Sequence, residues 1–160
     1  MGKRATIYKD DKGYILCPMS KIIAGFYIST EPWIRVYNNE FESKMKETLN
    51  AVLDISKDTE RVPTPAIKIL ESEKKAAKAN AKARAKKLDL KSFTSLNKKP
   101  TLCCEVKLEN GFLSFMPLIH DASMKGRGYT DYPGEPLKIE SHASDKEILA
   151  LIIEAYERTK

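Results

Sequence analysis

The sequence has little of the chemistry that metal sites and nucleophilic enzymes use. Histidine occurs only as His120 and His142, and cysteine only as Cys17, Cys103 and Cys104. No Cys-x-x-Cys, His-Glu-x-x-His or Walker-type pattern is present, so the sequence offers no common zinc, metalloprotease or P-loop motif. We therefore expect no metal and no cofactor. An odd number of cysteines, two of them adjacent, also fits a reducing cytoplasmic compartment better than a disulfide framework.

Long apolar runs are absent as well. No stretch approaches the roughly 18 consecutive apolar residues that a membrane-spanning helix needs. The opening residues, MGKRATIYKDDKGY, contain no apolar segment followed by a small-residue cleavage site. The sequence therefore predicts no membrane span and no signal peptide, which also favours a cytoplasmic location.

What is present is the composition of a globular protein. Hydrophobic residues make up 42% and charged residues 31% of the 160 residues, enough for one packed core and typical in length of one domain. We predict a single domain over 1–160 with a basic helical insertion at about 66–99.

Positive charge is concentrated in that insertion. Residues 68–99 hold eleven Lys or Arg against three acidic residues, a net +8 where the whole chain carries +6. Strong helix formers dominate ESEKKAAKANAKARAKK, and a basic face repeats every four residues at Lys74, Lys78, Lys82 and Lys86. Two interpretations stay open. The helix is a solvated surface that keeps the protein soluble, or it binds an acidic partner or nucleic-acid phosphates.

Alternation and turn signals predict an α+β fold with a mainly antiparallel sheet. An N-terminal meander of strands is expected at 4–8, 13–17, 24–28 and 33–37, followed by a helix at 40–55 with Asn38 or Asn39 as N-cap. Asn110-Gly111 joins a hairpin over 101–119, in which Cys103 and Glu105 are expected to point outward and Pro117 indicates a nearby sheet edge. A strand at 137–140 and a helix capped by Ser144 complete the chain.

The strand at 33–37 supplies a first candidate binding surface. Ile34 and Val36 are expected to face the core, because side chains alternate along a strand. Trp33, Arg35 and Tyr37 then lie together on the opposite face. We predict that these three residues contact a protein partner, although Trp33 also suits a packing role.

A loop at 120–136 supplies a second candidate surface, because long loops in compact domains are often functional. It carries Lys125, Arg127, Tyr129 and Tyr132 beside three glycines, and Arg and Tyr are frequent interface anchors. The run KGRGY at 125–129 could alternatively cradle a phosphate, but no strand-to-helix context surrounds it.

Evidence for catalysis is weak. Cys103, His120 and Asp121 could supply a nucleophile, a base and an orienting carboxylate. Cys103 is expected in the middle of a strand, however, rather than on a loop or at a helix N-terminus. We therefore predict no catalytic residues and no enzymatic activity.

Two stretches resemble a known family. RATIYKDDKGYILCP at 4–18 and GFYISTEPWIRVY at 25–37 are similar to the opening of one family of contact-dependent growth inhibition (CDI) immunity proteins. The resemblance continues more loosely through the 101–119 hairpin and KGRGY, about half of the chain. The Ala/Lys-rich helix at 74–87 is not part of the family pattern.

The resemblance implies a cytoplasmic bacterial protein that binds and neutralises the C-terminal toxin domain of a cognate exported effector. In some similar members the toxin is a metal-dependent DNA nuclease, and it docks by inserting a β-hairpin that extends the sheet. The partner expected on this basis is the cognate CDI toxin domain. A nucleic-acid-binding module using the helix at 74–87 is the alternative.

Overall fold

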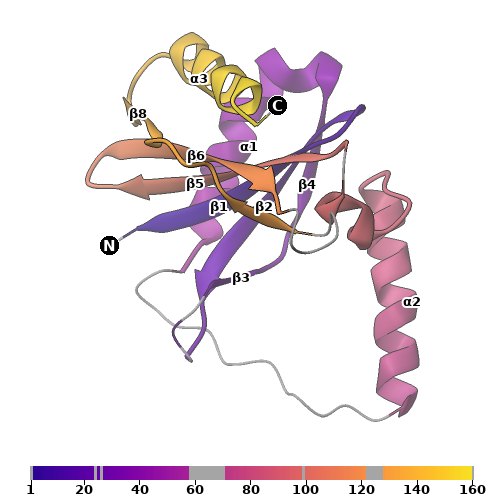
Figure 1. Ribbon diagram of the computed structural model, residues 1–160. Helices are drawn as coiled ribbons and strands as arrows, with labels where there is room; N and C mark the ends of the chain where they lie inside the picture. Colours follow the sequence, from indigo (N-terminus) through magenta and orange to yellow (C-terminus); the bar gives the residue numbers. More distant parts are fainter. Residues whose placement is uncertain are drawn as a thin grey trace.

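A curled antiparallel sheet forms the centre of the molecule (Figure 1). The computed structural model describes residues 2–23, 25, 27–57, 71–98, 100–121 and 128–159. The strands are β1 (Lys3–Lys9), β2 (Gly13–Lys21), β3 (Tyr27–Ser29), β4 (Ile34–Tyr37), β5 (Leu102–Glu109), β6 (Phe112–His120), β7 (Tyr129–Asp131) and β8 (Leu137–Glu140). Their order is β3-β2-β1-β5-β6-β7, with β4 also on β2 and β8 also on β6. The predicted α+β class is confirmed.

Two helices cover one face of this sheet. Helix α1 (Phe41–Ile55) and helix α3 (Asp145–Glu157) pack on it and on each other. The apolar sides of both helices are buried here, together with alternate residues of β1, β2, β5 and β6. Phe115 is fully buried at the centre of this layer, and the Tyr156 hydroxyl donates to the Ile7 carbonyl oxygen at 2.6 Å. This face therefore holds the main core.

The second face is only partly covered. After helix α2 (Glu71–Lys87), the chain turns through the 3-10 helix η2 (Phe93–Asn97) and packs against one half of this face. The buried residues of this second cluster are Ile15, Cys17, Leu88 and Leu96, with Tyr8, Trp33, Leu90 and Phe93 at its rim. Among the described residues, no helix covers the other half of the face. In the described residues, no helix is long and apolar enough to cross a membrane.

Three local predictions need correction. Asn38 and Asn39 do not cap α1, because Asn38–Glu40 forms a 3-10 turn (η1) and Glu40 is the N-cap. Pro117 does not mark an edge strand, because β6 pairs with β5 on one side and with β7 and β8 on the other. It lies at the break between these last two strands, where its carbonyl oxygen accepts from the Tyr132 N–H at 3.1 Å.

Cys103 is the third correction. It points away from the main core, as alternation requires, but its side chain is not exposed. The face that it shares with Tyr8 is the one covered by η2, so Cys103 is only 2% exposed. By contrast, the Ser144 cap is confirmed, because its Oγ accepts from the Glu147 N–H at 3.2 Å.

Gly13, at the start of β2, is expected to tolerate no side chain. Its φ is +146°, and an added Cβ would lie 2.3 Å from the carbonyl oxygen of Val36 in β4. Gly111 in the hairpin turn also has a positive φ, +78°, but an added Cβ there meets nothing within 4 Å. We expect Gly111→Ala to lower the free energy of unfolding by about 1 kcal/mol and Gly13→Ala by at least about 2 kcal/mol more. Urea denaturation tests this, and equal losses would contradict it.

Candidate functional site

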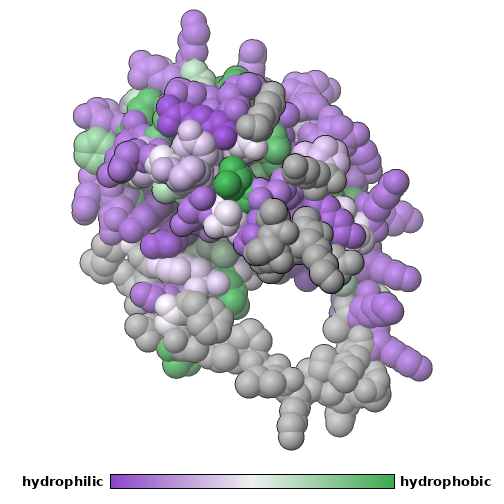
Figure 2. All heavy atoms as spheres, in the orientation of Figure 1, coloured by the Kyte–Doolittle hydropathy of each residue, from purple (hydrophilic) through white to green (hydrophobic). Residues whose placement is uncertain are grey.

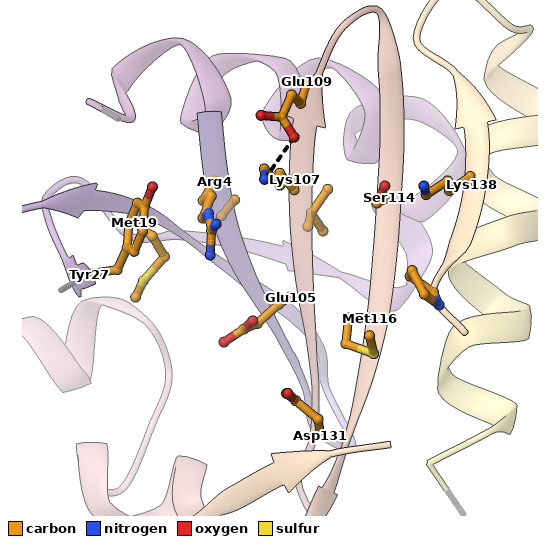
Figure 3. A pocket seen from close by; sticks show the side chains of 13 residues that line it. Arg4, Met19, Tyr27, Glu105, Lys107, Glu109, Ser114, Met116, Asp131 and Lys138 are labelled. Carbon is orange, nitrogen blue, oxygen red and sulfur yellow. Dashed lines mark ion pairs between the residues drawn. The ribbon is translucent and has the colours of Figure 1, made fainter. Parts of the chain in front are cut away.

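The open half of the second sheet face forms a groove of about 340 Å³ (Figure 3). Arg4 of β1, Glu105 and Lys107 of β5, and Ser114 and Met116 of β6 point into it because they alternate with core residues on their strands. The full lining is Arg4, Ala5, Met19, Tyr27, Glu105, Val106, Lys107, Glu109, Ser114, Met116, Asp131, Pro136 and Lys138. Strand β3 supplies one wall, and β7 and β8 supply the other.

The groove combines flexible apolar walls with charged groups. Met19 and Met116 contribute thioether side chains, which adapt to irregular occupants. The Arg4 guanidinium lies over the Tyr27 ring, 4.2 Å from its centroid, in a cation–π contact. The Arg4 Nε is buried and has no hydrogen-bond partner. Polar groups buried in this way usually find partners, so this orphan donor marks a position that the fold alone does not satisfy.

Charges are segregated along the groove. In Figure 3, Arg4 and Lys107 lie toward one end, where Lys107 pairs with Glu109 at 2.8 Å. Glu105 and Asp131 lie toward the other end. Among the described residues, neither of these two carboxylates forms an ion pair within 4.0 Å. This end therefore presents two carboxylates without an ion-pair partner.

The pKa of Glu105 reports this environment. The groove walls desolvate its carboxylate and raise the pKa, and repulsion from Asp131 raises it further, while the Arg4 charge offsets part of the rise. Deprotonated Glu105 is thus less favourable in the folded protein than in the unfolded chain. A cation placed between Glu105 and Asp131 would offset the cost of desolvating Glu105 and reduce the repulsion between the two carboxylates.

A pH-dependent gain in stability is expected from Glu105→Gln. Because the folded pKa of Glu105 is raised, the ionised side chain destabilises the fold above that pKa, and this cost vanishes as the pH falls through it. We expect Glu105→Gln to be more stable than the parent at pH 7 and the difference to shrink toward pH 4, measured by urea unfolding. Glu109→Gln is the control with the opposite sign, because the hydrogen bond from Lys107 lowers the pKa of Glu109. Loss of stability in Glu105→Gln at pH 7 would contradict the account.

Of the first predicted surface, two residues are engaged within the chain. The Arg35 guanidinium donates to both carboxylate oxygens of Asp10, at 2.7 and 2.8 Å, and its Nε donates to the Leu88 carbonyl oxygen at 2.8 Å. Trp33 packs edge-on against Phe93, with ring centroids 5.0 Å apart. The segment after α2 therefore covers the face that the sequence suggested was open.

Tyr37 differs from its two neighbours on the strand. Its side chain is 39% exposed, and its hydroxyl lies 3.4 Å from an oxygen of Asp89. Lys12 pairs with the same aspartate at 2.9 Å. Of the three residues, Tyr37 is the most exposed.

The residues of the second predicted surface fall in different places. Lys125 and Arg127 lie outside the described residues. Tyr129 is half-buried against His120, and its hydroxyl lies 2.5 Å from the Leu96 carbonyl oxygen and 3.0 Å from that of Thr101. It therefore ties β7 to η2. Tyr132 follows β7 and is partly exposed.

The basic helix is exposed where its side chains are described. Lys78, Lys82 and Lys86 are open to solvent on α2, whereas the side chain of Lys74 lies outside the description. Ala85 is buried, as is Leu88 just after the helix. The predicted lysine face is thus present on the helix and is not used for packing.

The geometry around Cys103 does not favour nucleophilic chemistry. Burial raises the pKa of its thiol well above the usual value, and the neighbouring Cys104, Glu105 and Cys17 raise it further, which keeps the group protonated. The Nε2 of His120 lies 2.7 Å from the Thr101 carbonyl oxygen and donates to it. In the described part of the chain, no three His, Cys, Asp or Glu side chains are placed to hold a metal ion.

Sequence reasoning missed most of the groove. Alternation along 101–109 did assign Glu105 to the outward face, and the same alternation is the signal that could have found Lys107. Arg4 and Asp131 carry no local signal, because only the pairing of β1, β5, β6 and β7 brings them together.

Comparisons with known proteins show the fold class. No protein-family model and no curated protein sequence matches the chain. A protein of unknown function from Neisseria meningitidis has a similar structure, with a TM-score of 0.73, 16% identity, and coverage of 100% of this chain and 96% of that one. A chain of the CdiA-CT/CdiI toxin and immunity complex from Yersinia pseudotuberculosis is also similar, with a TM-score of 0.63, 14% identity, and coverage of 100% and 98%. At these identities the likeness is one of fold.

Proposed function

We propose that this chain is an immunity protein that binds and neutralises the C-terminal toxin domain of a cognate CDI effector. The observation that carries the proposal is the end-to-end likeness to a chain of the CdiA-CT/CdiI complex, with a TM-score of 0.63 over 98% of that chain. The resemblance of 4–18 and 25–37 to a family of CDI immunity proteins points the same way, although it concerns sequence and not fold. Neutralisation by binding requires no catalytic residue of its own.

The groove is the proposed contact site. Its acidic end, at Glu105 and Asp131, suits a Lys or Arg side chain of the toxin, and Met19 and Met116 would pack on the aliphatic part of that side chain. Both carboxylates are exposed, so a toxin cation can reach them directly, and electrostatic attraction there would favour both encounter and binding. Tyr37, Tyr132, Lys125 and Arg127 remain predicted contacts.

Strand addition is the proposed docking mode. Strand β8 pairs only with β6 among the described strands, so its outer edge offers backbone N–H and C=O groups to another strand. Lys138 of β8 and Asp131 of β7 both line the groove. A toxin hairpin on this edge could therefore place a side chain in the groove while its backbone extends the sheet.

Growth of a sensitive bacterium tests the proposal. The toxin domain encoded in the same locus is induced alone, with this chain, or with a CDI immunity protein of another specificity. We expect growth only with this chain, and co-purification of the two proteins. Expression of this chain alone tests the opposite assignment, because a toxin would arrest growth. Arrest by the chain itself, or no rescue and no complex, would overturn the proposal.

A further inference from the structure

Helix α2 carries a continuous cationic stripe that the fold does not use. Lys75, Lys78, Lys82 and Lys86 fall on one side of the helix, because a spacing of three or four residues returns to the same face. All four are exposed, and none has a carboxylate partner among the described residues. Repulsion between like charges at this spacing destabilises the helix by about a few tenths of a kcal/mol per pair. A bound anion would therefore stabilise the helix.

The stripe is accessible because α2 stands clear of the sheet (Figure 1). Among the described side chains of α2, contacts to the rest of the protein lie in the last turns, where Ala85 is buried and Arg84 pairs with Glu31 and lies over the Phe93 ring. Hydrophilic side chains project from this part of the molecule into solvent (Figure 2). A long rod-like ligand can therefore approach α2 without meeting the body of the protein.

The composition of the helix indicates which kind of anion fits. Protein interfaces draw most of their energy from aromatic, apolar and Arg anchors, whereas between its lysines α2 offers mainly alanine. Stacking on unpaired bases also requires aromatic residues, and α2 has none. What it offers is a line of mobile ammonium groups spaced about one helical turn, roughly 5.4 Å, apart. Regularly spaced phosphates are the matching ligand.

We propose that α2 binds the phosphate backbone of duplex nucleic acid without sequence preference. Each lysine neutralises phosphates and releases condensed counterions, which supplies affinity but reads no base. The site on α2 is separate from the groove, where the toxin is proposed to bind. The protein would therefore bind nucleic acid electrostatically through a second surface. It stands or fails independently of the immunity function.

The test is fluorescence anisotropy with a labelled DNA duplex of arbitrary sequence. If all four lysines contact phosphates, the slope of log affinity against log salt is about −3.6, so affinity falls on the order of 100-fold between about 50 and about 200 mM salt. We expect a duplex to bind more tightly than a single strand of equal length, because its charge density is higher. We also expect the duplex to bind more tightly than polyglutamate.

Two matched variants assign the binding to α2. In one, Lys75, Lys78, Lys82 and Lys86 are changed to Gln, which keeps helix propensity. In the other, Lys3, Lys44, Lys46 and Lys146 are changed to Gln, which removes the same charge elsewhere. We expect the α2 variant to bind the duplex at least about 30-fold more weakly than the parent. The other variant should lose far less duplex affinity. The toxin affinity of the α2 variant should be unchanged. No duplex binding at about 50 mM salt, equal losses in both variants, or preference for polyglutamate would overturn the proposal.

Discussion

Charge reversal at the acidic end of the groove, Glu105→Lys with Asp131→Lys, is expected to weaken toxin binding on the order of 100-fold or more. Both carboxylates line the groove without an ion-pair partner among the described residues, and desolvation and repulsion raise the pKa of Glu105. The reversal replaces attraction for a cationic anchor with repulsion at both positions. Calorimetric titration of the purified toxin domain measures the loss.

A matched double variant separates this effect from net charge. Glu47→Lys with Glu154→Lys changes the charge equally, at exposed positions on α1 and α3. These helices cover the opposite face of the sheet, so toxin affinity should change less than about threefold. Circular dichroism and urea unfolding check that both doubles fold. Equal loss of affinity in the two variants would remove the groove from the interface.

The second large effect is on stability, where Arg35→Ala is expected to lower the free energy of unfolding by about 3–5 kcal/mol. The Arg35 side chain is 4% exposed and that of Asp10 is 14% exposed, so removing the guanidinium leaves a nearly buried carboxylate without its partner. It also breaks the hydrogen bond to the Leu88 carbonyl oxygen. Urea denaturation gives the loss.

Trp33 fluorescence provides an independent measurement on the Arg35→Ala variant. It packs on Phe93 of η2, and Arg35 ties the chain just before η2 to β4. Loosening of this segment should therefore change Trp33 fluorescence at lower urea than global unfolding. Lys12→Ala, which removes an exposed pair with Asp89, should cost less than about 1 kcal/mol. A loss of similar size in the two variants would contradict the structural role of Arg35.

Acid should weaken the ion pair between Arg35 and Asp10. Burial alone would raise the pKa of Asp10, but the hydrogen bonds and charge of Arg35, with the N–H groups of Lys12 and Gly13, outweigh it and lower the pKa. Because the folded pKa is depressed, this stabilisation is present above the unfolded pKa of about 3.9 and is lost as the pH falls through the folded value.

Local signals predicted the parts of the fold that local physics decides. Asn110-Gly111 specifies a tight hairpin because both residues adopt positive φ, +53° and +78°, and Ser144 specifies the start of α3 because its side chain caps a free N–H. The stripe of α1 follows from the helical period. Each of these features depends on residues close together in the chain.

The fate of the surface at Trp33 and Arg35 could not be predicted in that way. Arg35 lies on β4 and Trp33 immediately precedes it, and both contact the segment that follows α2. Whether that surface is open depends on a segment 53 residues further along, at Leu88, and no periodicity in β4 encodes its return. The groove has the same origin, because Arg4 and Asp131 come from opposite ends of the chain. The groove therefore depends on the order of the strands in the sheet, which no local sequence pattern encodes.

The measurement that tests the central claim most directly is binding of the purified chain to the purified toxin domain of the same locus, beside a toxin domain of unrelated specificity. The account predicts a stoichiometric complex with the cognate domain only, inhibition of its toxic activity at the same stoichiometry, and loss of both in the Glu105→Lys, Asp131→Lys double variant. No complex with the cognate domain, or equal binding to both domains, would contradict it.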